Sequence, residues 1–125
     1  MSLLVQKFGG TSLGSIERIK SVAKKIKASK EKGNDLVVVV SAMGHTTDEL
    51  TQLASEITID PPHREMDMLL STGEQISISL LTMALNELGT QAISLTGTQA
   101  GIITESAHGR ARILEIRTER IKNLL

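Results

Sequence analysis

The chain has 125 residues, with 14 basic and 14 acidic side chains and a formal net charge of zero at neutral pH. This balance gives no global positive field for nucleic acid, and one phenylalanine without tryptophan or tyrosine offers no platform for stacking bases. The length fits one domain or part of one. The lack of cysteine excludes disulfides. We expect a cytoplasmic protein that binds neither nucleic acid nor membrane, because no signal peptide or membrane-spanning run is predicted.

The first part of the sequence predicts a strand, helix, strand unit. Residues 3–7 are typical of a short buried strand, and Ser15 is a candidate N-cap for a helix with apolar residues at helical spacing up to Ile26. Gly33 ends that helix, and the β-branched run 36–40 is typical of a strand covered on both faces. This order predicts a right-handed βαβ unit in a parallel sheet.

The basic residues are concentrated in the first predicted helix and the acidic residues in the middle of the chain. We interpret the basic segment 18–32 as a solvated helix face, with a basic rim that attracts an anionic ligand as the alternative.

The second part predicts two more helices, a third strand and a closing helix. A helix follows the threonine-bearing turn 45–47, and the prolines at 61–62 separate it from a long helix over 64–88 that Gly89 ends. Residues 92–96 are predicted as the third strand, 97–109 as a loop with room for short strands, and 118–125 as a helix.

Each predicted strand ends in a polar or glycine-bearing loop, at 9–12, 41–47 and 96–98. In parallel α/β sheets, ligands bind at the carboxyl ends of the strands. Adjacent glycines let backbone amides approach a phosphate, and Lys7 supplies a mobile positive charge beside them. The spacing matches neither the Walker A loop nor the dinucleotide fingerprint. A tight strand-to-helix turn with an exposed lysine is the alternative interpretation.

Several motifs, in order along the chain, resemble those of the aspartate kinases in the amino acid kinase family. They are KFGGTS at 7–12, SAMG at 41–44, TTDEL at 46–50, REMDMLLSTGEQ at 64–75, SLTGTQAGI at 94–102 and HGRARI at 108–113. The resemblance covers the whole chain. It implies an α/β fold, a three-layer sandwich with a largely parallel sheet, incomplete at the C-terminus.

The resemblance also implies a reaction and a nucleotide site. ATP would donate its γ-phosphoryl group to the side-chain carboxylate of L-aspartate, giving aspartyl phosphate for lysine, threonine and methionine biosynthesis. Lys7 would contact the transferring phosphate, and Phe8, Gly9 and Gly10 would form the nucleotide-phosphate loop. A carboxylate nucleophile is already ionised at neutral pH, so positioning and charge neutralisation suffice. Mg²⁺ would be held mainly through the nucleotide phosphates, with no metal site made by the protein alone.

The implied aspartate pocket uses Ser41 and Thr47 as lining residues and Glu74 as the partner of the substrate's amino group. A carboxylate in an apolar stretch is costly unless it is paired, and a substrate ammonium would pair it. The alternatives are that Glu74 faces solvent at a helix break near Gly73, and that the two hydroxyls cap a helix or make a turn. The three histidines have no metal-binding spacing.

Two features depart from the family pattern. Thr98 stands where a tryptophan is expected, and the chain ends at Leu125, before a GRGGSDTT-like segment, the nucleotide half and the regulatory domains. We therefore expect 1–125 to be the N-terminal part of the kinase domain, with the phosphate loop and half of the substrate pocket, and to be inactive alone. Uncovered apolar faces predict a homo-oligomer or association with kinase subunits. The alternatives are another carboxylate kinase, such as acetylglutamate or glutamate kinase, and a non-catalytic assembly module.

Overall fold

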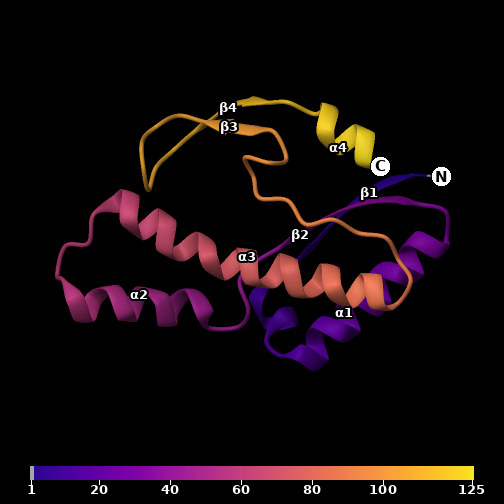
Figure 1. The fold of residues 1–125 in the computed structure, drawn as a ribbon, viewed down its shortest axis with the longest axis horizontal. Coiled ribbons are helices and arrows are strands. Elements are labelled where there is room, and N and C mark those ends of the chain that lie inside the picture. The colour runs from indigo at the N-terminus through magenta and orange to yellow at the C-terminus, as the bar shows by residue number, and fades with distance from the viewer. Residues whose placement is uncertain (1) are drawn as a thin grey trace.

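The structure is a computed structural model that describes residues 2–125 (Figure 1). In chain order its elements are β1 (Leu3–Phe8), η1 (Gly10–Leu13, a 3₁₀ helix), α1 (Ile16–Glu31), β2 (Asp35–Val40), α2 (Thr46–Ile57), α3 (His63–Glu87), β3 (Ile102–Thr104), β4 (Ile113–Ile116) and α4 (Glu119–Leu124).

The strand, helix, strand unit forms as predicted. β1 and β2 are parallel and in register from Leu3 opposite Asp35 to Phe8 opposite Val40, with α1 as the connection. The Ser15 hydroxyl accepts a hydrogen bond from the backbone N–H of Arg18 at 3.2 Å, which confirms the predicted N-cap. Beyond the end of α1, Gly33 has a φ of 89°, a conformation that glycine adopts without strain.

The hydrophobic core lies on one face of this two-stranded sheet. Its buried residues are Leu13, Ile19, Val22, Ala23, Ile26, Leu81 and Leu85. Phe8 and alternate residues of β2 pack against them. Side chains between these positions point to the opposite face, where Val5 is 68% and Val39 is 45% exposed. We expected a buried first strand and a second strand covered on both faces. Both strands are covered on one face only, because α1 and α3 pack on the same side of the sheet.

α3 is one unbroken helix, as predicted for 64–88, and the polar residues 71–74 do not break it. Gly89, with a φ of 81°, follows its C-cap as predicted. By length and composition alone, α3 could cross a membrane. Core helices meet the same criteria, and in this structure Ser77, Leu81 and Leu85 of α3 are buried. α2, the helix predicted after the turn 45–47, contacts α3 but buries no residue fully, so its apolar side chains are only partly covered.

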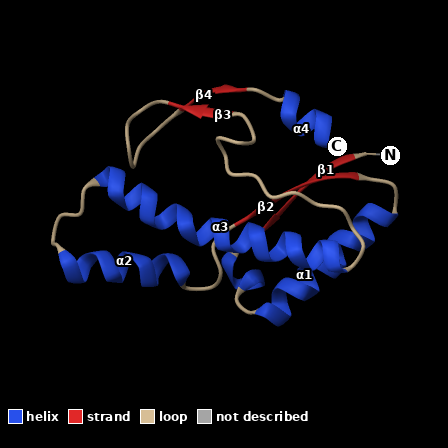
Figure 2. Ribbon diagram, in the orientation of Figure 1, coloured by secondary structure: helices blue, strands red, loops and turns tan. Residues whose placement is uncertain are grey.

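The predicted third strand is absent from the part of the chain that the structure describes. Residues 92–96 pair with neither strand of the first sheet. The backbone N–H groups at the two ends of the segment are engaged locally: Ala92 donates to the Asn86 side chain at 3.0 Å and Thr96 to the Gln99 side chain at 2.9 Å. β3 and β4 form a separate antiparallel sheet (Figure 2), and β4 had no sequence prediction. α4 confirms the closing helix.

Candidate functional site

The carboxyl ends of β1 and β2 are joined by backbone hydrogen bonds between the loops that follow them. The N–H of Ser41 donates to the carbonyl of Phe8 at 3.2 Å, and the N–H of Gly44 donates to the carbonyl of Gly10 at 2.8 Å. We call residues 8–14 and 41–47 together the strand-end junction. The first two predicted loops therefore meet at one edge of the sheet, whereas the third, at 96–98, follows a segment outside the sheet.

Free backbone amides lie on the first loop of the strand-end junction. The carbonyl of Thr11 accepts from Nη1 of Arg18 at 2.7 Å. With the carbonyls of Phe8 and Gly10, three carbonyls of this loop are therefore hydrogen-bonded to neighbouring groups. The N–H groups of Gly9, at the N-cap of η1, and of Gly10 and Thr11, in its first turn, donate to no acceptor within residues 2–125. Amides of this kind form a cradle for an anion such as a phosphate.

The two adjacent glycines have different roles in this loop. A Cβ atom at Gly10 would lie 2.9 Å from the carbonyl oxygen of Ala42 and 3.2 Å from that of Gly44. A Cβ atom at Gly9 would meet nothing within 4 Å. Packing against the second loop therefore requires glycine at position 10, while Gly9 leaves space open beside the free amides. The alternative of a tight strand-to-helix turn with an exposed lysine agrees with Gly10 and Lys7, but it gives no reason for glycine at position 9.

Lys7 and Phe8 project to opposite faces of β1. Phe8 packs against the core and its carbonyl accepts from the N–H of Ser41, so neither its ring nor its carbonyl is free for a ligand. Lys7 lies opposite Val39 on the uncovered face, and its side chain is exposed. Its ammonium group makes no ion pair or hydrogen bond with any other residue of the range 2–125. A lysine so placed is free to bind an anionic ligand.

Ser41 and Thr47 lie at the two ends of the second loop. Ser41 directly follows β2 and is half-buried, and Thr47 is an exposed residue in the first turn of α2. The N-cap position of α2 is His45, and no side chain of the described residues caps this helix. The helix-capping alternative for the two hydroxyls is therefore wrong.

Gly73 brings α3 into contact with the second loop. A Cβ atom at this position would lie 3.1 Å from Cβ of Ala42 and 3.3 Å from Cγ2 of Thr46. Glycine within a helix costs about 1 kcal/mol relative to alanine, so its presence here indicates a packing requirement. Glu74 follows it directly. α3 is continuous, so the helix break in the alternative for Glu74 is wrong, but the other part of that alternative holds: the Glu74 side chain faces solvent and has no ion-pair partner within residues 2–125.

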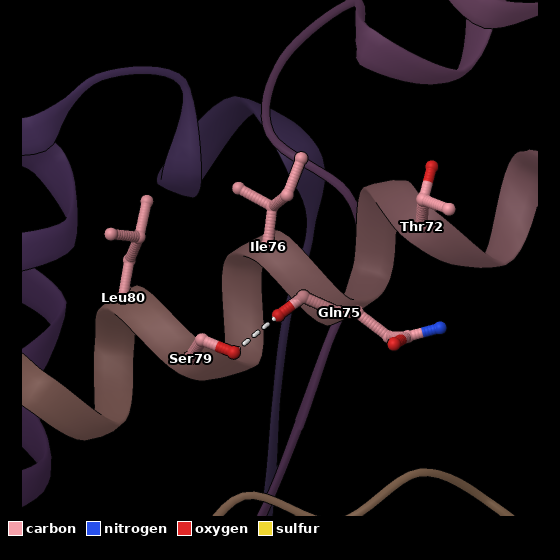
Figure 3. Close-up of a pocket in the computed structure, with 5 residues that line it drawn as sticks. All are labelled: Thr72, Gln75, Ile76, Ser79 and Leu80. Carbon is pink, nitrogen blue, oxygen red and sulfur yellow. Dashed lines mark hydrogen bonds between the residues drawn. The ribbon is translucent and has the colours of Figure 1, made fainter.

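Two hollows lie near the strand-end junction, and neither encloses it. A cleft of about 1070 Å³ is bounded by β2, α3, the segment 90–98 and α4, and it includes Glu74 and Thr98 but not Lys7, Ser41 or Thr47. A smaller depression of about 440 Å³ on α3 contains no predicted site residue (Figure 3). It is lined by Thr72, Gln75, Ile76, Ser79 and Leu80. The junction therefore lies outside both hollows.

Arg18 and Gly73 had no predicted role, although the sequence contains a signal for each. A cation in the first turn of a helix opposes the helix dipole, so Arg18 there suggests a partner outside the helix. That partner is the carbonyl of Thr11. Gly73 lies in the middle of a long apolar helix, where glycine suggests close approach of another segment.

Comparison with known proteins places this geometry in a family. The model of the amino acid kinase family matches residues 2–125. An aspartokinase of Bacillus sp. strain MGA3 is 65% identical over the whole chain, and Aspartokinase 2 of Bacillus subtilis is 61% identical over 94% of it. The chain spans 30% and 29% of their lengths, respectively.

A solved structure gives the same assignment. The crystal structure of aspartate kinase from Synechocystis matches 80% of the chain, and 17% of its own chain, with a TM-score of 0.78 at 63% identity. This match supports the predicted α/β fold with a parallel sheet. The chain therefore belongs to the amino acid kinase family.

Proposed function

We propose that this chain supplies the phosphate loop and part of the aspartate pocket of an aspartate kinase. The observation that carries the proposal is the strand-end junction, where two loops joined by backbone hydrogen bonds present free amides beside an unpaired lysine. The identity of 65% to an aspartokinase supports aspartate over other carboxylate substrates, although the chain spans only part of that relative. The product, aspartyl phosphate, would enter lysine, threonine and methionine biosynthesis.

Groups in the junction, together with Lys7 and Glu74 beside it, have separate roles in this proposal. A side-chain carboxylate oxygen of L-aspartate attacks the γ-phosphorus of ATP, and the bond from that phosphorus to the bridging oxygen breaks, so that ADP leaves with the electron pair. The amides of Gly9 and Gly10 bind phosphate oxygens, and the ammonium of Lys7 neutralises charge on the transferring group. Ser41 and Thr47 orient the substrate, and Glu74 pairs with its amino group.

Mg²⁺ would accompany the nucleotide in this proposal. Within residues 2–125, no group of three histidine, aspartate or glutamate side chains is arranged to hold a metal ion. The residues of the junction do fit the phosphates themselves, because the open space at Gly9 lies beside unpartnered amides. When bound, the metal ion would screen the negative charge that the nucleotide brings to an anionic substrate.

The experiment that tests the function is a chimera. The 125 residues replace the matching segment of the Bacillus sp. aspartokinase, and ATP- and aspartate-dependent formation of acyl phosphate is measured. We expect activity, and we expect Lys7→Ala to lower kcat/KM by roughly 100-fold, as loss of a preorganised charge-stabilising group does. Lys24→Ala is the matched control, since Lys24 is an exposed lysine on α1, away from the junction. Equal loss in both variants, or a preference for glutamate or acetylglutamate, would contradict the proposal.

A non-catalytic role in assembly is the second candidate, and the uncovered strand face favours it. Leu3 and Val5 on β1 are 59% and 68% exposed, so a partner subunit or a second copy would gain apolar contacts there. In our proposal the isolated chain forms oligomers and has no kinase activity of its own. Sedimentation that shows a monomer at micromolar concentration, or acyl phosphate formation by the isolated chain, would overturn these two expectations.

A further inference from the structure

We propose that Gly73 is a positioning residue, which sets the distance between α3 and the loop 41–47 and thereby places the carboxylate of Glu74 for the substrate's amino group. This inference rests on the proposed function and adds to it a determinant of aspartate affinity. Nothing at Gly73 itself touches the substrate. Its contribution is the absence of a side chain at the point where the helix meets the loop.

The packing around Gly73 is tight on the side of the loop. Gly73 is buried, and Ala42 is only 4% exposed. A Cβ atom at position 73 would lie 3.1 Å from Cβ of Ala42, 3.3 Å from Cγ2 of Thr46 and 3.6 Å from Cδ1 of Leu50. Ordinary contacts between carbon atoms are longer than the first two of these distances. Even the smallest side chain would therefore push the helix and the loop apart.

The displacement would act on both sides of the aspartate pocket. Ala42 directly follows Ser41, and Thr46 directly precedes Thr47, so the atoms that oppose a side chain at position 73 belong to neighbours of both lining residues. Glu74 lies on the other side of the contact, next to Gly73 in α3. A shift of a few tenths of an ångström would thus change the separation of Glu74 from Ser41 and Thr47 together.

The backbone around Gly73 has little freedom to absorb this shift. Ser77, one turn further along α3, is 0% exposed, and its hydroxyl donates to the carbonyl of Gly73 at 3.4 Å. The loop is held by the hydrogen bond from the N–H of Gly44 to the carbonyl of Gly10. Since α3 and the loop 41–47 are both anchored, the steric clash can be relieved only if one moves relative to the other.

The test is a double-mutant cycle in the chimera with the Bacillus sp. aspartokinase. Gly73→Ala should raise the KM for L-aspartate by about 10-fold with a smaller change in kcat, because binding of the amino group is remote from the reacting carboxylate. Ala42→Gly removes the opposing Cβ atom, so Gly73→Ala combined with Ala42→Gly should recover most of the lost affinity. A merely structural role would give no such selective recovery of the KM for aspartate. Gly97→Ala is the control, since a Cβ atom at Gly97 meets nothing within 4 Å.

The outcomes separate this inference from the proposed function. If the parent chimera phosphorylates aspartate but Gly73→Ala leaves its KM unchanged, or the double variant shows no recovery, the positioning role is wrong and the function stands. If the parent chimera does not use aspartate, the function itself fails. Should Gly73→Ala prevent folding, Ala42→Gly in the same chain must restore both folding and aspartate affinity, or the inference is overturned.

Discussion

The strand-end junction and the hairpin of β3 and β4 are attached to the rest of the chain in different ways. The junction is held by backbone groups and by atoms that pack where glycine has no side chain, as at Gly10 and Gly73. The loop between β3 and β4 is held on α3 by hydrogen bonds to one partly exposed carboxylate. Asp67 accepts from the N–H of Gly109 at 3.0 Å, and its carboxylate oxygen also lies 3.0 Å from Nδ1 of His108.

This difference separates a region built for fixed geometry from one attached by solvent-exposed contacts. Backbone hydrogen bonds and close atomic packing tolerate little displacement, and phosphoryl transfer depends on such positioning. An exposed pair of a carboxylate and a protonated histidine contributes about 0–1 kcal/mol and is screened by salt, so it holds a loop only loosely. Substitutions in the two regions should therefore differ both in magnitude and in their sensitivity to salt.

The largest effect is expected at Gly10. Gly10→Ala places a Cβ atom 2.9 Å from the carbonyl oxygen of Ala42, and because the opposing atoms belong to backbone, no side-chain rotation relieves the contact. We expect the free energy of unfolding to fall by about 2–3 kcal/mol, the range of an overpacked site, together with the loss of ATP binding. Urea denaturation of the isolated chain measures the first effect, and a nucleotide titration of the chimera measures the second.

The control for this prediction is a glycine without close neighbours. Gly97→Ala introduces the same group at a position where a Cβ atom meets nothing within 4 Å, so its stability should change by less than about 0.5 kcal/mol. If both alanine variants unfold at the same urea concentration as the parent chain, close packing does not fix the geometry of the junction.

The sequence was sufficient to predict the part of the fold that local signals determine. The cap at Ser15, the glycines at 33 and 89 and the β-branched run at 36–40 each act on their own segment. The cap, the two helix ends and the strand are confirmed, although the strand is covered on one face only. The third strand failed for a different reason. Residues 92–96 have the composition of a strand, but a strand requires a partner with free backbone groups in reach, and pairing is a property of the tertiary arrangement.

The candidate site was predictable as far as its loops. Glycines and hydroxyls after two strands indicate that those loops meet at one edge, and the hydrogen bond between Gly44 and Gly10 agrees with this. The contact of Gly73 with Ala42 joins residues far apart in the sequence, and neither residue type reveals the other as its neighbour. The packing reason for glycine at positions 10 and 73 is therefore visible only in the folded structure.

A smaller effect is expected at the cap that follows the junction. Ser15→Ala removes the oxygen that accepts the N–H of Arg18, and loss of an N-cap costs about 1 kcal/mol. Since α1 carries much of the core, the whole transition should shift in urea denaturation. Ser15→Asp is the matched variant, because its carboxylate can accept the same hydrogen bond, and it should retain the stability of the parent. An alanine variant as stable as the parent would show that the cap contributes nothing.

The smallest effect on global stability is expected at the hairpin attachment, and salt distinguishes it from the junction. Asp67→Ala removes both contacts to the loop, and we expect the free energy of unfolding to fall by less than about 1 kcal/mol at low salt, and by less still at 1 M salt. Amide hydrogen exchange should accelerate in residues 105–112 while the amides of β2 keep their protection. The Gly10→Ala effect, which arises from packing, should persist at high salt. A loss of protection in β2 on Asp67→Ala would mean that the hairpin stabilises the sheet directly, and the distinction between the two regions would fail.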